Sequence, residues 1–416
     1  MISPVSTYRL QLHAGFTMDD ASSIAPYLQA LGVTHLYLSP IFQSAPGSAH
    51  GYDVTDPTHI DDERGGRDAF DRLCETCTKL GLGIVLDIVP NHMDISGPHN
   101  EHFSRVLRLG RDSAAAPIFD IDWDAPGSDG RLVLPVLGKP IEEELSESNI
   151  RLDLADDGLA AAYYEHSWPL RPESVQAVLE RASADDPSGT LRELAESYER
   201  FDPTTDDETA LDLLGAKLVS AAESDGQAAR ALRASLSHFS EGERLSEIIG
   251  AQHYAPTFWR EGSERLNYRR FFDIDTLIGV RVEDEMVFEE THRLILELAS
   301  LDGVDGLRVD HPDGLRDPKG YFDRLADRTD GTWVSAEKIL GRDESLPEDW
   351  RVAGTSGYDF LNDAMAVLIE PSSETPFSDL YREITDDGRS FDEIERDAKR
   401  TVATDLLGAD LRRLSR

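Results

Sequence analysis

One stretch, residues 303–312 (GVDGLRVDHP), constrains the fold of this chain most. It begins as a short apolar run, ends abruptly in charged and polar side chains, and is stopped by a proline. A buried parallel strand that delivers polar groups to the rim of a barrel has this pattern. The two-residue period of a strand places Arg308 and Asp310 on one face, where the guanidinium is expected to keep the carboxylate ionised, as a nucleophile requires. A purely structural ion pair at a strand end would give the same pattern.

Further short apolar runs alternate with stretches of helical periodicity. The apolar runs are residues 5–12, 34–38, 83–89 and 332–336. The helical stretches are residues 18–31 and 66–80, and about 284–300 and 318–328. Strands that alternate with helices predict βαβ units and a parallel sheet, so the predicted fold class is α/β, a TIM-type (β/α)8 barrel. Residues 353–360 are a candidate sixth strand. A barrel of this type needs eight strands to close, so we expect it to be incomplete at its C-terminal end.

The distance between the third and fourth predicted strands indicates an inserted domain, because too many residues lie between them for a loop. Its strongest helical patterns fall at 171–200 and 206–235, with extended pieces near 118–123 and 131–137. The predicted organisation is strands one to three in residues 1–93, a mainly helical insertion in 94–265, strands four to six in 266–370, and a helical segment that starts a truncated C-terminal part in 371–416.

Acidic residues outnumber basic ones: 80 Asp and Glu against 41 Lys and Arg, for a formal net charge of −39. Binding to nucleic acid or to anionic membranes requires a cationic surface, so neither is expected as a partner. Only six of the basic residues are Lys. An acidic, Lys-poor surface suits a salt-rich cytosol, in which screening reduces self-repulsion, so we hypothesise a halophilic origin.

The N-terminus and the two cysteines indicate a cytoplasmic protein. Residues 1–5 lack the basic and apolar regions of a secretory signal, and no apolar run approaches the ~20 residues of a membrane span. Cys74 and Cys77 form a C-x-x-C inside a helical pattern. A zinc site would need a second ligand pair, so two ordinary thiols in a reducing compartment are expected. No metal or organic cofactor is predicted.

Polar side chains follow three successive predicted strands. They are Asp87, Asn91 and His92 after the third strand, Arg308, Asp310 and His311 after the fourth, and Glu337 after the fifth. Active sites of TIM-type barrels lie at the C-terminal rim, so we expect these side chains to meet there. Carboxylates from adjacent strands can approach to about 5 Å, the separation in retaining glycosidases, with Asp310 as nucleophile and Glu337 as acid/base. The alternative for each residue is a cap for the following helix.

These residues resemble the signatures of the α-amylase family of glycoside hydrolases. Residues 87–92 match the family's first signature, 306–311 match the second, and Glu337 matches the third. The resemblance implies the same two catalytic carboxylates. It also implies that Arg308 and His92 hold the sugar at the reacting position.

The loop at residues 50–56 resembles the family's loop in which a tyrosine stacks on that sugar. Tyr52 would offer its aromatic face to the apolar face of a pyranose, whereas a tyrosine that packs in a turn would look the same in sequence. The predicted substrate-binding residues of the barrel are Tyr52, Asp53, Asn91, His92, Arg308 and His311. Some family members hold calcium beside the first-signature asparagine, but the sequence establishes no full set of oxygen ligands.

Several longer stretches resemble one branch of the family. They are residues 39–54, 134–140, 252–254 with 258–260, 267–273, 310–315 and 357–362. The resemblance implies an intramolecular transglycosylation that moves the reducing-end glucose of a maltooligosaccharide from an α-1,4 to an α,α-1,1 linkage, by a retaining double displacement. This isomerisation requires water to be kept out and the glucose to be kept in. The candidates for that enclosure are His253, Trp259, Tyr268 and Arg269, for which ordinary core and interdomain packing is an equal alternative.

The family's third acidic residue, in a fourth signature, has no match in this sequence. Asp359 does not match it, because no His precedes it. We therefore expect the N-terminal part of a longer enzyme, or one half of a split enzyme whose partner is a separate C-terminal half. The expected ligand is a maltooligosaccharide or an α-1,4-glucan. An α-glucan hydrolase, a 4-α-glucanotransferase, and an inactive fragment that binds glucan or needs a C-terminal partner stay open.

Overall fold

The structure is a computed structural model that describes residues 3–203, 205, 207–223, 226–341 and 343–415. By contact the chain divides into two compact units. The first unit comprises Met1–Asn91 and Arg281–Leu411, and the second comprises His92–Val280 and Arg412–Arg416. Residues 206 and 224–225 of the predicted helix at 206–235 lie outside the described residues.

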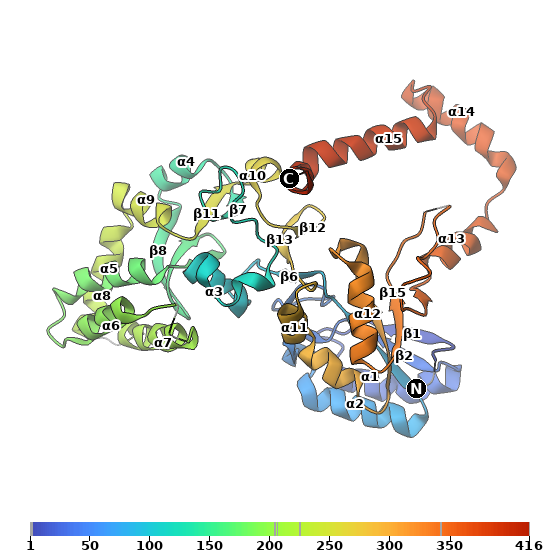
Figure 1. Ribbon diagram of the computed structural model, residues 1–416, viewed down its shortest axis with the longest axis horizontal. Coiled ribbons are helices and arrows are strands. Elements are labelled where there is room, and N and C mark those ends of the chain that lie inside the picture. Colours follow the sequence, from blue (N-terminus) through green and yellow to red (C-terminus); the bar gives the residue numbers. More distant parts are fainter. Residues whose placement is uncertain (1–2, 204, 206, 224–225, 342, 416) are drawn as a thin grey trace. The chain divides into compact units, whose positions relative to one another are not determined.

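A six-stranded sheet, parallel throughout, forms the core of the first unit (Figure 1). Its strands, in the order in which they pair, are β1 (Thr7–Leu10), β2 (His35–Leu38), β5 (Gly83–Ile88), β14 (Val304–Val309), β15 (Trp333–Ala336) and β16 (Gly354–Thr355). The strands pair in chain order, with the second unit inserted after β5. The predicted α/β barrel-type fold, open at one side and with an insertion after the third strand, is confirmed.

Helices of the first unit accompany this sheet. They are α1 (Met18–Leu31), α2 (Gly66–Leu80), α11 (Glu285–Ala299) and α12 (Pro318–Arg328). α2 packs against β5 and α11 against β14, which leaves every residue of β5 buried. Local sequence sets the helix starts: Thr17 and Asp20 form a capping box at the N-terminus of α1, and Asp317 caps α12. The short strands β3 (Phe42–Ser44) and β4 (Val54–Ile60) pair antiparallel and carry the loop that contains Tyr52.

The sixth strand is much shorter than predicted. β16 has two residues, and α13 (Tyr358–Ala366) occupies the rest of the segment for which a strand through residue 360 was predicted. Gly357 lies between them in a left-handed conformation (φ 103°), which ends the extended backbone before the helix.

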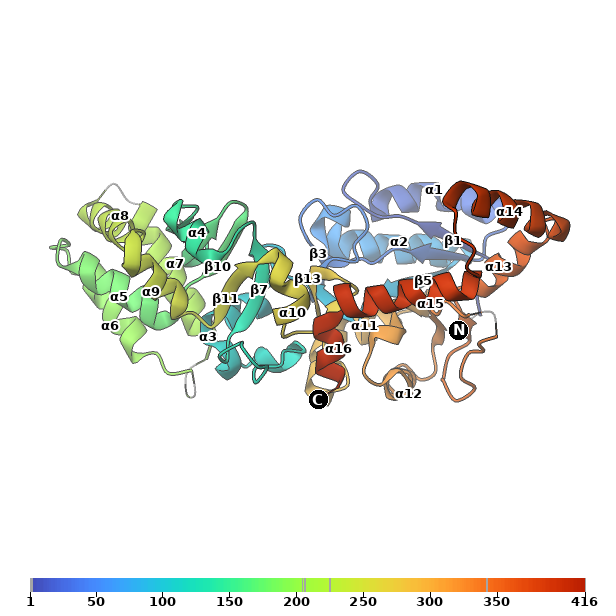
Figure 2. The ribbon, with the colours of Figure 1, turned by 90° about the horizontal axis from the view of Figure 1, so that it is seen from above.

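A run of three exposed helices follows β16 (Figures 1 and 2). These are α13, α14 (Glu374–Thr385) and α15 (Phe391–Thr401). The helical prediction for 371–416 covers α14 and α15, whereas α13 was not predicted. All their residues are described, and none of them is buried. Large apolar side chains such as Phe360, Phe377 and Phe391 are therefore exposed along them. A further helix, α16 (Gly408–Leu414), follows.

The second unit is mainly helical, with α5 to α8 packed together (Figure 2). Its helices are α3 (Glu101–Leu109), α4 (Ile141–Ser146), α5 (Pro172–Ser183), α6 (Thr190–Arg200), α7 (Thr209–Glu223), α8 (Gln227–Phe239), α9 (Gly242–Gly250) and α10 (Gly262–Arg265). Its strands are β6 (His92–Asp94), β7 (Leu132–Leu137), β8 (Ile150–Ala155), β9 (Gly158–Tyr163), β10 (His166–Pro169), β11 (Tyr254–Phe258), β12 (Arg270–Phe271) and β13 (Ile274–Gly279).

Two features of this unit differ from the sequence analysis. The antiparallel sheet β10-β9-β8 was not predicted, because β9 is rich in Ala and lacks the β-branched residues that mark strands. Residues 266–280, which we assigned to the barrel, cluster with the insertion, since β13 pairs antiparallel with β6. Among the described residues, no helix combines the length and the apolar character that crossing a bilayer requires.

Candidate active site

A single guanidinium group lies at the centre of the candidate site. Arg308 Nη1 donates hydrogen bonds to Asp87 Oδ1 at 2.7 Å and to Asp310 Oδ1 at 2.8 Å. Arg308 Nη2 lies 3.1 Å from Glu337 Oε1. Because β5, β14 and β15 run parallel, their carboxyl ends share one edge of the sheet and bring these side chains together. The structure thus places Asp310 and Glu337, the two predicted catalytic carboxylates, on one cation.

The two carboxylates differ in access. The Asp310 side chain is 8% exposed and that of Glu337 is 20% exposed. The backbone N–H of His311 donates to Glu337 Oε2 at 3.0 Å. His311 has a left-handed backbone (φ 43°), which is uncommon for a residue with a side chain and serves here to direct its N–H at Glu337. The His311 N–H therefore holds one carboxylate oxygen of Glu337, while the side chain stays accessible to a leaving group.

The protonation of Asp310 differs from the expectation that Arg308 keeps it ionised. Burial raises the pKa of Asp310 to about 8; Arg308 acts in the opposite direction, and the charges of Asp87 and Glu337 raise it further. Burial likewise raises the pKa of Asp87, against the lowering effect of Arg308. One guanidinium faces three carboxylates, so it cannot compensate all of them in a poorly solvated site.

Asp87 connects this cluster to two tyrosines. Tyr37 on β2 donates its O–H to Asp87 Oδ2 at 2.8 Å, and Tyr52 donates to the same oxygen at 2.7 Å. Burial raises the pKa of both phenols well above the ordinary value for tyrosine, so both remain hydrogen-bond donors. Tyr52, the predicted sugar-stacking residue, and Arg308 thus both donate hydrogen bonds to the Asp87 carboxylate.

The loop that carries Tyr52 is tightly built. Gly51 has φ 81°, and a Cβ at this position would lie 2.7 Å from the backbone oxygen of Pro40, so only glycine fits. Asp53 was predicted to bind substrate. Its Oδ1 accepts a hydrogen bond from Ser48 Oγ at 2.5 Å and lies 3.7 Å from His50 Nδ1. Asp53 thus contacts its own loop, and these contacts brace the turn.

Asn91 and His92 are both buried but belong to different units. In the first unit Gly314 lies directly against Asn91, since a Cβ at Gly314 would lie 2.5 Å from Asn91 Oδ1. In the second unit His92 begins β6, and its ring lies 4.5 Å from the ring of Phe271, measured between centroids.

Two of the four predicted enclosure residues pack inside the second unit. Tyr268 is 2% exposed and donates its O–H to the Asp275 carbonyl at 2.7 Å. Arg269 Nε donates to Asp120 Oδ2 at 3.0 Å, and Nη2 donates to the Val280 carbonyl at 2.7 Å. These contacts fit core packing, the alternative that the sequence left open.

The other two enclosure residues differ from each other. His253 lies against Gly110, where a Cβ would come 2.6 Å from His253 Nδ1, and burial lowers its pKa. Trp259 is 54% exposed, with the Arg260 guanidinium stacked 5.0 Å from its ring centroid. Of the four, Trp259 presents the most surface that a ligand could cover.

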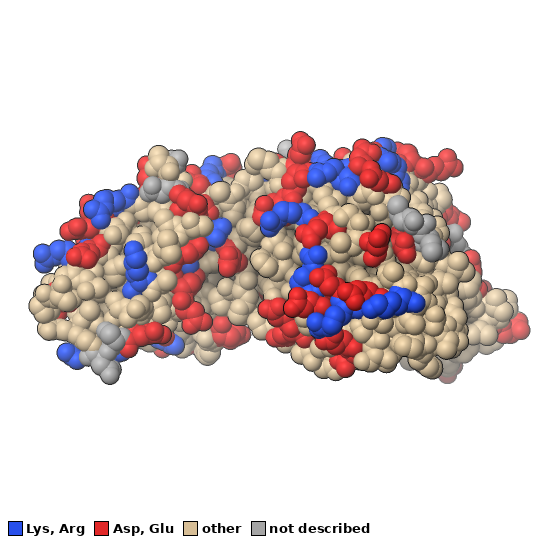
Figure 3. Space-filling view, turned by 90° about the horizontal axis from the view of Figure 1, so that it is seen from below, with Lys and Arg blue, Asp and Glu red and all other residues tan. Residues whose placement is uncertain are grey.

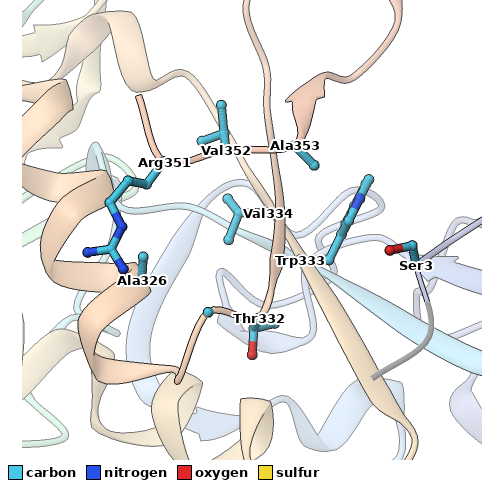
Figure 4. A pocket seen from close by; sticks show the side chains of 9 residues that line it. Ser3, Ala326, Thr332, Trp333, Val334, Arg351, Val352 and Ala353 are labelled. Atoms are coloured by element: carbon cyan, nitrogen blue, oxygen red, sulfur yellow. The ribbon is translucent and has the colours of Figure 1, made fainter. Parts of the chain in front are cut away.

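A cavity of about 440 Å³ lies elsewhere in the first unit (Figure 4). Its lining includes Ser3, Trp333 and Arg351. Thr332 and Trp333 mark the amino end of β15, whereas the carboxylates gather at the carboxyl ends of the strands. The cavity is therefore not part of the candidate site.

Sequence reasoning missed Arg9, Gln11 and Tyr37. Arg9 and Tyr37 are register partners on β1 and β2, and Arg9 Nη2 donates to the phenol oxygen of Tyr52 at 2.9 Å. Both strands were predicted, and their two-residue period was visible. Polar residues in mid-strand carried no family signature, so only the side-chain positions revealed their part.

Comparison with known proteins places these motifs in context. A family model, "Alpha amylase, catalytic domain", matches residues 20–115. A protein of Mycobacterium tuberculosis named "Putative maltooligosyl trehalose synthase" is 34% identical over 99% of this chain and 45% of its own length. The solved maltooligosyltrehalose synthase of Arthrobacter ramosus is 36% identical, with a TM-score of 0.76, over 99% of this chain and 44% of its own.

A third relative is more distant. A solved structure from Sulfolobus tokodaii, titled a hypothetical maltooligosyl trehalose synthase, is 29% identical with a TM-score of 0.73. It matches all of this chain over 46% of its own length. The chain thus spans about half the length of the relatives that it matches. It is similar along nearly its whole length to maltooligosyl trehalose synthases, and its residues 20–115 match the catalytic domain of α-amylases.

Proposed function

We propose that this chain supplies the nucleophile and the acid/base of a maltooligosyl trehalose synthase. The reaction converts the reducing-end α-1,4 linkage of a maltooligosaccharide to α,α-1,1. The observation that carries the proposal is the pairing of Asp310 and Glu337 on Arg308, at the edge of the sheet where parallel strands end. The named relatives, aligned over nearly the whole chain, support the reaction type.

The chemistry proceeds in two displacements. In the form of the enzyme in which Asp310 is ionised, Glu337 gives its proton to the last glycosidic oxygen while the Asp310 carboxylate bonds to the anomeric carbon. This step releases glucose and leaves a glycosyl ester. The glucose turns over within the site. Its anomeric hydroxyl attacks the ester carbon, Glu337 takes the hydroxyl proton, and the Asp310 carboxylate leaves. Two inversions give net retention, and no atom is gained or lost.

The fate of maltopentaose tests this proposal. With the C-terminal half of a relative supplied as a second polypeptide, the expected result is loss of reducing ends without any change in chain length. Free glucose would indicate an α-glucan hydrolase, and longer chains would indicate a 4-α-glucanotransferase. Binding of maltopentaose without any product, even with that half present, would favour an inactive fragment that binds glucan.

A separate C-terminal half is the partner that we propose for the complete reaction. The chain spans about 45% of its relatives' length, which fits this proposal, and the fourth family signature finds no match in the sequence. The measurement is activity on maltopentaose with and without the remaining half of a relative, expressed as a second polypeptide. Equal activity in both samples would refute the requirement.

A cytoplasm rich in salt is the environment that we propose. The surface carries many Asp and Glu side chains, as the face in Figure 3 illustrates, and the formal net charge is −39. Screening of this charge should stabilise the folded state. The midpoint of thermal unfolding is expected to rise between low salt and molar KCl, and equal midpoints would contradict the proposal.

A further inference from the structure

Arg9 on β1 determines how the Tyr52 phenol can be oriented. Arg9 Nη2 donates to the phenol oxygen at 2.9 Å, and the phenol O–H donates to Asp87 Oδ2 at 2.7 Å. One hydrogen bond accepted and one donated leave the hydroxyl little rotational freedom. The cation therefore restrains the far end of the ring that the family resemblance places against the sugar.

Gln11 restrains the backbone of the same loop. Arg9 Nη1 donates to Gln11 Oε1 at 2.6 Å. Gln11 Nε2 in turn donates to the carbonyl oxygens of Ala49 at 3.0 Å and His50 at 3.2 Å. Both carbonyls lie within three residues of Tyr52. Two side chains from the β1 segment thus hold the loop at its backbone and at its ring.

The placement of Arg9 is not that of a structural ion pair. Its contact with Asp87 Oδ2 is 3.9 Å, longer than its bonds to Tyr52 and Gln11. The Arg9 side chain is 36% exposed, and its guanidinium also lies 5.3 Å from the Tyr37 ring centroid. A cation that served folding alone would gain more from direct contact with the carboxylate.

We propose that Arg9 and Gln11 are positioning residues that hold Tyr52 as the platform for the reacting sugar. This inference rests on the proposed function, since a platform has a task only if a sugar binds beside Asp310. Because a stacked ring contacts the sugar before and during reaction alike, loss of the platform should raise KM more than it lowers kcat.

A double-mutant cycle tests the connection between Arg9 and Tyr52. Maltopentaose affinity is measured by calorimetry for the wild type, Arg9→Met, Tyr52→Phe and the double variant. A hydrogen bond from a charged donor predicts about tenfold weaker binding for Arg9→Met. In the Tyr52→Phe background the same change should cost less than about twofold, because the bond is already absent. Equal losses in both backgrounds, or no loss in either, would overturn the proposal.

Two further variants serve as controls. Arg72→Met removes an exposed guanidinium that pairs with Asp19 in the same unit and should leave affinity unchanged. Arg9→Lys keeps the charge and is expected to recover part of the affinity, because an ammonium can still donate to the phenol. If Arg9→Met does not fold, the comparison of Arg9→Lys in the wild-type and Tyr52→Phe backgrounds decides the question in the same way.

A measurement without sugar separates this inference from the proposed function. Protein labelled with 3-fluorotyrosine gives a 19F resonance for Tyr52, identified by its absence in Tyr52→Phe. Arg9→Met and Gln11→Leu should each shift or broaden that resonance, whereas Arg72→Met should not. An unchanged resonance would overturn the positioning role even if maltopentaose is converted. A wild type that does not bind maltopentaose would refute the proposed function and leave this readout intact.

Discussion

Two clusters of arginine and acidic side chains, one in each unit, have opposite charge ratios. In the first unit Arg308 is shared by Asp87, Asp310 and Glu337. In the second unit Asp120 is shared by two guanidinium groups: Arg269 Nε lies 3.0 Å and Arg413 Nη1 2.7 Å from its carboxylate oxygens.

The pKa values of the two aspartates move in opposite directions. Burial raises the pKa of Asp310, and Arg308 alone does not reverse this effect. Burial also acts to raise the pKa of Asp120, but Arg413 and Arg269 together lower it below the ordinary value. An aspartate beside two cations forms ion pairs with both and stays ionised to lower pH than a free aspartate. An aspartate that shares one cation with two other carboxylates loses its proton only at higher pH, and as a nucleophile it acts in its ionised form.

The largest expected effect is on turnover. Asp310→Asn should lower the rate at which maltopentaose loses its reducing ends by about a thousandfold or more, since the nucleophile is lost. Asp19→Asn, an exposed aspartate of the same unit, is the control and should retain activity. A rate for Asp310→Asn within tenfold of the wild type would remove Asp310 from its proposed role.

Removal of the shared cation should have the next largest effect. Arg308→Met leaves buried carboxylates without a counter-ion, so the free energy of unfolding at pH 7 should fall by about 3 kcal/mol. Chemical denaturation measures this loss. Arg72→Met, whose guanidinium is exposed, should change stability by less than about 1 kcal/mol. If the free energy of unfolding falls by similar amounts in the two variants, the buried Arg308 ion pairs contribute no more to stability than an exposed pair.

The second-unit cluster should respond to pH as an ordinary ion pair. Because the pKa of Asp120 is lowered in the folded protein, its contribution exists above the unfolded pKa near 4 and disappears as pH falls through the folded pKa. Asp120→Asn should therefore cost about 2 kcal/mol at pH 7 and much less at pH 3. A cost independent of pH would mean that packing, not charge, is what the substitution disturbs.

Asp310 should show the opposite pH dependence. Its folded pKa of about 8 exceeds the unfolded value, so its contribution is complete below pH 4 and is lost as pH rises towards 8. The stability of Asp310→Asn relative to the wild type should thus increase from pH 5 to pH 8, by at most about 1.4 kcal/mol per pH unit. A relative stability that stays flat over this range would contradict the raised pKa.

The parallel sheet was predictable because each strand is a short apolar run bounded by helical periodicity. β14 and β5 lie within one residue of their predicted bounds, and the polar residues after them meet as expected. Prediction failed where the pattern is weak. The Ala-rich strand β9 has little intrinsic preference for extended structure and forms through pairing with β8 and β10.

The sequence by itself determined which residue types stand at the strand ends, and therefore that two carboxylates and an arginine would share one edge of the sheet. Only the tertiary structure decided how their charges balance. The pKa of Asp310 depends on burial, on Arg308 and on the two other carboxylates, Asp87 and Glu337, which the pairing of β5, β14 and β15 brings together. The same reason explains why the sequence did not reveal the part of Arg9, Gln11 and Tyr37. Their hydrogen bonds depend on where the side chains lie in three dimensions, and no local pattern in the chain records that position.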